Sequence, residues 1–303
     1  MSDATTGFPE ALGAAAAKTE ATLDACLPAP GGDPGEAALI EAMRYAVMGG
    51  GKRLRAFLVV ETARLCGGPM AGALRVAASV ECLHAYSLAH DDMPCMDDDD
   101  LRRGKPTVHK AWDEATAVLA GDALQTMAFE LLAAPETHSS GAVRAHLCLR
   151  LAQASGVAGM VGGQALDLAA EAAAAPLTAA QVNRLQALKT GALIAFSAEA
   201  GAILAEAPAE DVARIQAYAR CLGEAFQIAD DLLDVTGTEA EVGKRVGKDA
   251  GAGKATFVDI LGVDGARVRA DALVAEAGSH LDAFPGDASL LKDAAAFVVS
   301  RRS

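Results

Sequence analysis

The chain has 303 residues, of which 52% are hydrophobic and only 4% aromatic, so it can bury a large interior built mainly from aliphatic side chains. Forty acidic residues against 26 Lys and Arg give a formal net charge of −14, which excludes a general nucleic-acid binder. The six cysteines form no CxxC pair, and the first ten residues carry no basic segment followed by an apolar one, so we expect reduced thiols and a cytoplasmic protein without a membrane span.

Alanine, the best helix former, dominates the composition, and β-branched runs are scarce. This predicts an all-α fold in a single domain over residues 1–303, with residues 1–8 disordered. A first helix is expected over about 9–27, before the Pro- and Gly-rich segment 28–35. The next helix runs from about Glu36 to the three glycines 49–51.

A third helix is expected from about Leu54 to Gly67, and a long one over about 71–92, stopped by Pro94. Further along, Thr178 and Gln181 have the spacing of a capping box ahead of a helix that carries Lys189. Another long helix is predicted over about 209–234, because apolar residues recur there at helical spacing. No segment shows the alternation of apolar and polar residues that is typical of strands.

Two clusters of aspartates end predicted helices. They are Asp91-Asp92-Met-Pro-Cys-Met-Asp97 and Asp230-Asp231-Leu-Leu-Asp234. In the second cluster the first and last aspartates share a helix face, which Gln227 and Gly223 continue. Crowded carboxylates repel one another unless a cation neutralises them, and hard oxygen ligands favour Mg²⁺. A lone acidic run is usually a solvated helix face, but two such runs at the ends of apolar helices predict clusters that share divalent cations with one diphosphate.

A basic segment, Gly49-Gly-Gly-Lys52-Arg53-Leu54-Arg55, is the counterpart of the acidic clusters. It fails the Walker pattern because no Ser or Thr follows the Lys, but a glycine turn that leads into a helix start still favours anions. The alternative is a set of exposed basic residues at a helix start. His84 lies two helical turns before Asp91 on the same face, either as a core histidine or as part of the site.

Taken in order, these motifs resemble the short-chain trans-isoprenyl diphosphate synthases of the polyprenyl synthetase family, most of all the bacterial farnesyl type. The resemblance extends over nearly the whole chain. The motifs that carry it are Gly-Lys52-Arg-Leu-Arg55, His84, Asp91-Asp92-xxxx-Asp97, Leu101-Arg102-Arg103-Gly, Gly162-Gly-Gln164-x-x-Asp167-Leu, Lys189-Thr190, Gln227-x-x-Asp230-Asp231-x-x-Asp234 and Gly253-Lys254. The resemblance implies an isoprenoid-synthase-type helical bundle around a central apolar cavity, usually as a homodimer.

The resemblance also implies a reaction, the Mg²⁺-dependent head-to-tail condensation of isopentenyl diphosphate with an allylic diphosphate. Three Mg²⁺ ions would be held by Asp91, Asp92, Asp97, Asp230 and Asp234. The cations implied for the allylic diphosphate are Arg102, Lys189, Lys254 and, more weakly, Lys244. The residues implied to bind the diphosphate of isopentenyl diphosphate are Lys52, Arg55, His84 and Arg103. Thr190 and Gln227 would place oxygen dipoles near the carbocation.

Two features depart from the family pattern or extend it. Val258 stands where many relatives have a proline after the late Gly-Lys, which puts the loop around Lys254 in doubt. The basic end, Arg301-Arg302, either closes over a diphosphate or frays.

Product length is expected to be set near the first acidic cluster. Four residues separate Asp92 from Asp97, and Tyr86 lies five residues before Asp91, a combination that resembles the farnesyl type. Tyr86 is about 7.5 Å back along the helix, where its ring would close the floor of a substrate tunnel. Ser87 lies nearer the Asp91 face and is the second candidate for chain-length control, so a plain core role for Tyr86 stays open.

Three rival functions follow from the same residues. A geranylgeranyl diphosphate synthase has the same chemistry and differs in product length. A class I terpene cyclase is disfavoured, because its second metal motif would normally carry Asn or Asp, Ser or Thr, and Glu. A non-catalytic regulatory subunit usually loses an acidic motif, and both are intact here.

Overall fold

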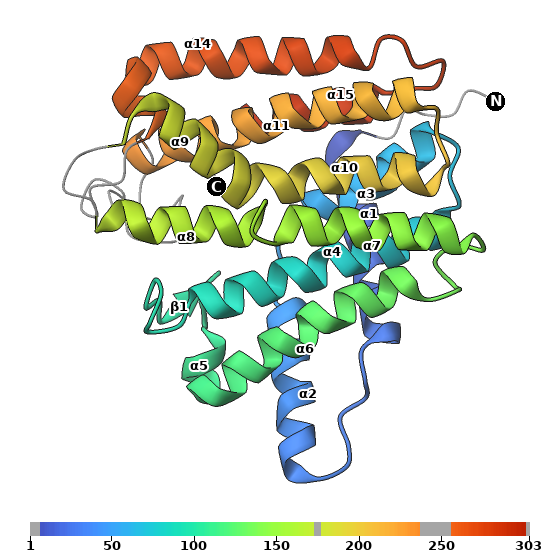
Figure 1. The fold of residues 1–303 in the computed structure, drawn as a ribbon, viewed down its shortest axis with the longest axis vertical. Coiled ribbons are helices and arrows are strands. Elements are labelled where there is room, and N and C mark those ends of the chain that lie inside the picture. Colours follow the sequence, from blue (N-terminus) through green and yellow to red (C-terminus); the bar gives the residue numbers. More distant parts are fainter. Residues whose placement is uncertain (1–6, 173–176, 237–255, 301–303) are drawn as a thin grey trace. The chain divides into compact units, whose positions relative to one another are not determined.

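The structure is a computed structural model that describes residues 7–172, 177–236 and 256–300, and helices dominate these ranges (Figure 1). The expected all-α class is confirmed. One local feature was not predicted: strands β1 (Leu101–Arg102) and β2 (Lys105–Pro106) pair as a minimal antiparallel hairpin. The chain divides into two compact units, Met1–Cys148 and Leu149–Ser303, and the boundary falls inside helix α7 (Gly141–Ser155).

The first unit is built around one long central helix, α4, which packs against α1, α3 and α6. Its helices are α1 (Phe8–Cys26), α2 (Pro34–Val47), α3 (Leu54–Leu65), α4 (Met70–Asp91), α5 (Val108–Ala111) and α6 (Glu114–Ala133). Helix α3 is buried continuously from Ala56 to Ala63, a run that is apolar except for Glu61 and Thr62. Phe8 is helical rather than part of a disordered terminus, because its ring packs edge-on against Phe57 at 5.3 Å between ring centres.

The second unit is centred on α11, which packs against α10, α14, α15 and η1. Its elements are α8 (Met160–Glu171), α9 (Ala179–Gln186), the π-helical turn η1 (Ala187–Gly191), α10 (Ala192–Leu204), α11 (Ala209–Thr236), α14 (Phe257–His280) and α15 (Ser289–Ser300). The capping box of Thr178 and Gln181 is present at the start of α9. The helix expected to carry Lys189 changes character after Gln186, so that Lys189 lies in η1.

One apolar run in the described part of the chain, Ala179–Leu204, is long and apolar enough to cross a membrane by length and composition. It comprises α9, η1 and α10, and 61% of its apolar window is buried inside the structure. Helix α10, the last part of this run, is covered by protein rather than exposed to solvent. Such burial is typical of a core helix.

Candidate active site

The first acidic cluster is folded back onto the end of α4. The Asp97 amide donates to the Asp91 carbonyl at 2.8 Å, and the Asp99 amide donates to the Asp92 carbonyl at 3.2 Å. The Thr107 hydroxyl donates to the Asp99 carbonyl at 2.8 Å, which ties the loop to the start of α5. Asp91, at the end of α4, and Asp97, in the loop that follows, are half-buried, so both carboxylates keep access to solvent.

Asp92 is paired with Arg102. The Arg102 Nε donates to both carboxylate oxygens, at 2.8 and 2.9 Å, and the Nη2 group also donates to the same carboxylate. Asp92 is only 2% exposed. Burial raises the pKa of the Asp92 carboxyl, and the Arg102 guanidinium opposes that rise. Asp92, expected to bind metal, and Arg102, expected to bind diphosphate, thus neutralise each other's charge in this structure.

The hairpin explains how two adjacent arginines reach different partners. Arg103 and Gly104 both have positive φ, 51° and 75°, as the central residues of a two-residue type I′ turn require. Arg102 returns to Asp92, whereas the Arg103 guanidinium donates to the Gly50 carbonyl. A Cβ at Gly51 would lie 2.7 Å from the Arg103 Nη1, so the glycine leaves room for the guanidinium. A small pocket of about 50 Å³ is lined by Asp92, Arg102 and Arg103.

The basic segment at the start of α3 contains an exposed residue, Lys52, and a buried one, Arg53. Arg53 is 6% exposed. It donates to Glu81 at 2.8 Å, to Glu20 at 3.3 Å and to the Val47 carbonyl at 2.6 Å. Lys52 next to it is exposed. Arg53 therefore holds α3 in place, which the local sequence pattern did not reveal.

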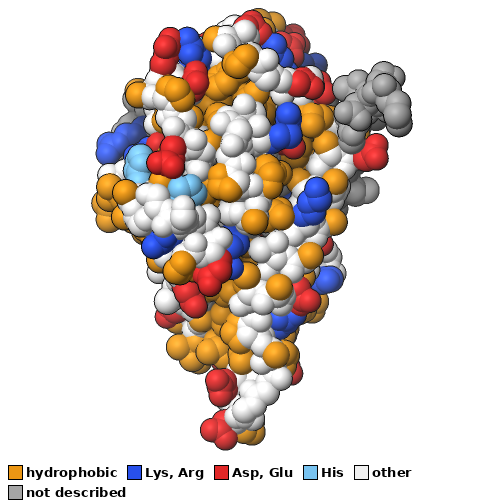
Figure 2. All heavy atoms as spheres, turned by 90° about the vertical axis from the view of Figure 1, so that its right-hand side faces the viewer, with side chains coloured by type: hydrophobic (Ala, Val, Ile, Leu, Met, Phe, Trp, Pro, Cys, Tyr) orange, Lys and Arg blue, Asp and Glu red, His pale blue; other side chains and the backbone are white. Residues whose placement is uncertain are grey.

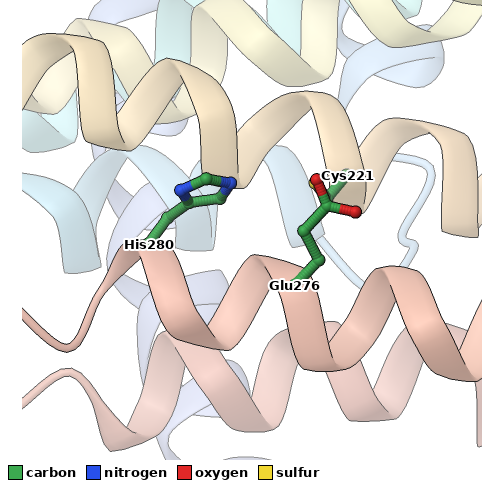
Figure 3. A group of neighbouring side chains, drawn as sticks. All are labelled: Cys221, Glu276 and His280. Atoms are coloured by element: carbon green, nitrogen blue, oxygen red, sulfur yellow. The ribbon is translucent and has the colours of Figure 1, made fainter.

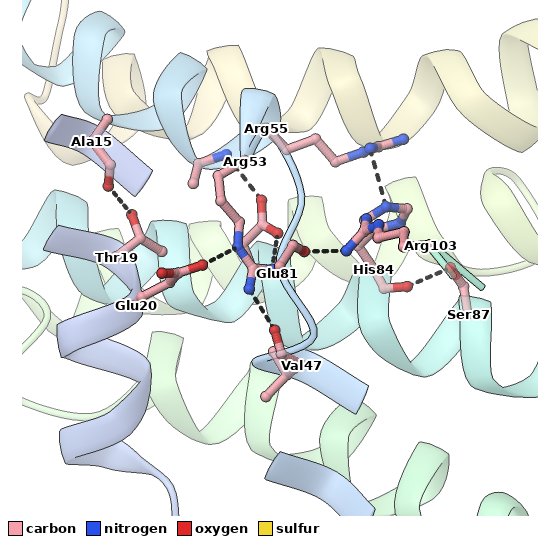
Figure 4. A network of polar contacts seen from close by, with 12 residues as sticks. Ala15, Thr19, Glu20, Val47, Arg53, Arg55, Glu81, His84, Ser87 and Arg103 are labelled. Atoms are coloured by element: carbon pink, nitrogen blue, oxygen red, sulfur yellow. Dashed lines mark hydrogen bonds and ion pairs between the residues drawn. The ribbon is translucent and has the colours of Figure 1, made fainter. Parts of the chain in front are cut away.

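Arg55 and His84 lie together, as expected, with the Arg55 Nη1 3.4 Å from the His84 Nε2 (Figure 4). Burial lowers the pKa of the His84 imidazole well below its usual range, and the guanidiniums of Arg55, Arg103, Arg102 and Arg53 lower it further. The ring is therefore neutral, and Nε2 accepts a hydrogen bond from Arg55.

The two candidates for chain-length control differ in their contacts. Tyr86 is 8% exposed, and its ring packs edge-on against His90 at 5.2 Å. Burial raises the pKa of the Tyr86 hydroxyl, and a hydrogen bond with Gln125 of α6 opposes that rise. Ser87 donates to the His84 carbonyl at 2.9 Å within α4. Tyr86 thus packs at the interface of α4 and α6.

The second acidic cluster contains one buried aspartate, Asp231, which is 2% exposed. It accepts from the Gln227 Nε2 at 3.1 Å, from the Phe257 amide at 2.8 Å and from the Gln186 Nε2 at 3.5 Å. It thereby joins α11 to the end of α9 and the start of α14. The other two aspartates of the cluster, Asp230 and Asp234, are exposed and half-buried.

Gln227 is oriented by its bond to Asp231. Because the amide nitrogen donates to that carboxylate, the amide oxygen is directed elsewhere, as the expected oxygen dipole requires. One turn earlier, a Cβ at Gly223 would lie 3.3 Å from the Gly191 Cα. The missing side chain lets α11 approach η1 closely.

Lys189 in η1 is held by Asp167 of α8, with 2.6 Å between the ammonium and the carboxylate. The approach of the two elements depends on Gly163, where a Cβ would lie 2.2 Å from the Lys189 backbone nitrogen. Thr190 follows, half-buried.

Gln164 was not singled out for a role, but its side-chain nitrogen is buried and has no hydrogen-bond partner among the described residues. The π-helical turn is a feature frequently found at functional sites.

Several expected site residues lie outside the described ranges: Lys244, Lys254, Arg301 and Arg302. Val258 lies within them, as the second residue of α14, and is buried. Thr256 caps that helix, in a capping box with Asp259. Helix α14 therefore starts normally without the proline of many relatives.

Comparison with known proteins identifies the family. The polyprenyl synthetase family matches residues 36–280. Farnesyl diphosphate synthase of Escherichia coli (strain K12) is 45% identical over 87% of this chain and 89% of its own. Geranylgeranyl pyrophosphate synthase 9 of Arabidopsis thaliana is 41% identical over 87% of this chain and 74% of its own. A crystal structure of an FPP/GFPP synthase from Zymomonas mobilis has a TM-score of 0.87 and 49% identity, and it covers 95% of this chain and 97% of its own. The chain belongs to the polyprenyl synthetase family.

Proposed function

We propose that the chain condenses isopentenyl diphosphate with dimethylallyl or geranyl diphosphate, and that farnesyl diphosphate is its main product. The reaction proceeds by ionisation, condensation and elimination. The 45% identity to a farnesyl diphosphate synthase over most of both chains carries this proposal. The intact acidic clusters support it against a non-catalytic subunit. The family match spans both compact units, which supports one catalytic domain over residues 1–303.

The donor atoms in both acidic clusters fit Mg²⁺. Asp91 and Asp97 offer half-buried carboxylates, and Asp230 and Asp234 offer carboxylates on a more exposed helix face. Hard carboxylate oxygens are the ligands that Mg²⁺ prefers, and it usually takes one or two of them together with substrate phosphate oxygens. We expect three ions when a diphosphate is bound. Asp92 is expected to join their carboxylate ligands once Arg102 leaves it and turns to the substrate diphosphate. When bound, the ions neutralise the negative charge that develops on the departing diphosphate.

The allylic diphosphate is expected to contact Arg102 and Lys189, with Lys254 and Lys244 as further candidates. Asp167 and Asp92 hold the first two in place before substrate arrives. Positive charge beside the departing diphosphate stabilises the negative charge that develops on it. Thr190 and the oriented oxygen of Gln227 face the positive charge that develops on carbon. We add Gln164, whose buried donor would find an acceptor in a bound diphosphate.

Isopentenyl diphosphate is expected to bind Lys52, Arg55, Arg103 and His84. Arg55 and Arg103 provide planar forks suited to phosphate oxygens. The neutral His84 accepts from Arg55 and fixes its orientation. The released diphosphate serves as the base for the final proton loss.

The test is incubation of the purified chain with isopentenyl diphosphate and either dimethylallyl or geranyl diphosphate, with and without Mg²⁺. Farnesyl diphosphate, formed only with Mg²⁺, is the expected product. A twenty-carbon product would replace the proposal with the geranylgeranyl alternative. No product from either allylic substrate would favour the regulatory subunit.

The same chain is expected to form a cytoplasmic homodimer. Hydrophobic side chains reach the surface between charged ones (Figure 2). On α8, Val161 and Leu168 are exposed two helical turns apart, and on α6 Leu119 is 55% exposed. The expectation of a homodimer comes from the family resemblance, because single exposed apolar side chains are also common on monomers. Light scattering coupled to size-exclusion chromatography should give twice the chain mass of 30.7 kDa.

A further inference from the structure

A second group of metal-binding side chains lies in the second unit, apart from the aspartates. Cys221 of α11 and Glu276 and His280 of α14 place a sulfur, a carboxylate oxygen and an imidazole nitrogen within 4.8 Å of one another (Figure 3). Cys221 precedes Asp230 by about 13 Å along α11 at 1.5 Å per residue. The cluster is therefore distinct from the Asp230 and Asp234 face.

The ligand types favour a borderline metal ion over Mg²⁺. Thiolate, imidazole and carboxylate are the ligands of Zn²⁺, and three protein ligands leave a fourth position for water. Mg²⁺ takes oxygen ligands and is disfavoured by sulfur. These preferences set the site apart from both aspartate clusters.

The positions of the three residues suit a cation as well. Glu276 and His280 are four residues apart and so share one face of α14. His280 is the last residue of α14, where the negative end of the helix dipole favours a cation. Cys221 is buried, His280 half-buried and Glu276 exposed, so an ion can enter from solvent and still reach the sulfur.

We propose that Cys221, Glu276 and His280 bind one divalent transition-metal ion of the Zn²⁺ class, which ties α11 to α14. As the ion binds, the thiol loses its proton to solvent and the sulfur becomes a ligand. Burial and the neighbouring Glu276 carboxylate raise the pKa of the Cys221 thiol to about 11. The proposal does not depend on the prenyl transfer reaction, because it uses none of the residues assigned to that reaction.

The test uses Co²⁺ as a spectroscopic probe of the full chain in excess Mg²⁺, which occupies the aspartates. One equivalent of Co²⁺ should produce a thiolate-to-cobalt charge-transfer band. Cys221→Ser should abolish the band. Cys95→Ser, which removes the exposed thiol within the first acidic cluster, should keep the band, and so should Asp230→Asn.

Variants of Glu276 and His280, which lie nearer the solvent than the buried Cys221, test the site with less risk of misfolding. Glu276→Gln and His280→Ala should each weaken Co²⁺ binding by at least about tenfold. Zn²⁺ should raise the Tm of the parent chain but not that of Cys221→Ser, because only the folded parent binds the ion. The proposal is overturned by a band that survives Cys221→Ser, by the absence of a band at one equivalent, or by unchanged affinity in both Glu276→Gln and His280→Ala.

Discussion

Neighbouring aspartates in the second acidic cluster have different surroundings. Asp231 is buried and accepts hydrogen bonds from Gln186, Gln227 and the Phe257 amide, whereas Asp230 next to it is exposed. Asp231 is therefore a structural residue, and Asp230 is the better candidate for a metal ligand. Substitutions at the two positions should separate stability from activity.

Asp230→Asn should lower turnover by at least about 100-fold, because it removes charge from the expected metal cluster. It should change the free energy of unfolding by less than about 0.5 kcal/mol, since the side chain is exposed. Asp231→Ala should destabilise the fold by about 1–3 kcal/mol, because it leaves buried donors without their acceptor. Urea unfolding and a turnover assay check both. A stable, inactive Asp231→Ala with an active Asp230→Asn would reverse the assignment.

His84 predicts a pH effect on stability. Its pKa in the folded chain lies well below that of an unfolded histidine, about 6.5. Below pH ~6.5 the unfolded chain therefore binds a proton that the folded chain does not. The free energy of unfolding should fall as the pH is lowered, by up to about 1.4 kcal/mol per pH unit from this residue. Urea unfolding at several pH values should show a smaller slope for His84→Gln; an equal slope in both chains would contradict this.

Tyr86 provides the residue-scale test of product length. Its ring is buried at the α4–α6 interface, so Tyr86→Ala should open space and lengthen the product beyond fifteen carbons. Chain-length analysis of the products decides the matter. If the variant still makes only the fifteen-carbon product, Tyr86 is a core aromatic and does not close the tunnel. Ser87→Ala is the matched control on the next residue of α4 and should leave product length unchanged if Tyr86 alone sets it.

Among the elements, the contact of α8 with η1 depends on a missing side chain. Gly163→Ala would place a Cβ 2.2 Å from the Lys189 backbone and push the two elements apart. We expect a loss of stability of about 1–3 kcal/mol, together with lower turnover because Lys189 moves. Urea unfolding and turnover measure the two effects.

A matched glycine elsewhere provides the control for Gly163. Gly13 in α1 is exposed, and a Cβ there would meet nothing within 4 Å. Gly13→Ala should therefore stabilise the chain by about 0.5–1 kcal/mol through helix propensity. If both substitutions had the same effect, the close approach of α8 and η1 would not explain Gly163.

At the scale of the whole molecule, the helices that the sequence predicted end close to where the structure ends them, because helix ends have local causes. The helices α6, α7, α8, α14 and α15 were not predicted individually. The start of α3 at Leu54 follows the glycines 49–51, and α9 begins after the capping box of Thr178. The predicted range 209–234 is close to the observed Ala209–Thr236. These signals lie within a few residues of the boundaries that they set.

The sequence could not predict features that arise from distant partners. Arg53 looked like its basic neighbours, but it binds Glu81, 28 residues away. Asp231 could not be told from Asp230, because its distinguishing partners are Gln186 and the Phe257 amide. The π-helical turn at Lys189 likewise accompanies a contact with α8 that no local pattern encodes. Whether the assigned site residues bind substrate and metal stays a prediction.

Aspartates from both clusters are expected to hold ions that bind the same diphosphate. A crystal structure of the chain with Mg²⁺ and an allylic diphosphate analogue that cannot ionise tests this expectation most directly. We expect carboxylate oxygens of Asp91 and Asp230 at about 2.0–2.1 Å from Mg²⁺ ions that share one diphosphate. A diphosphate bound elsewhere, with either aspartate turned to bulk solvent and no ion beside it, would contradict the account.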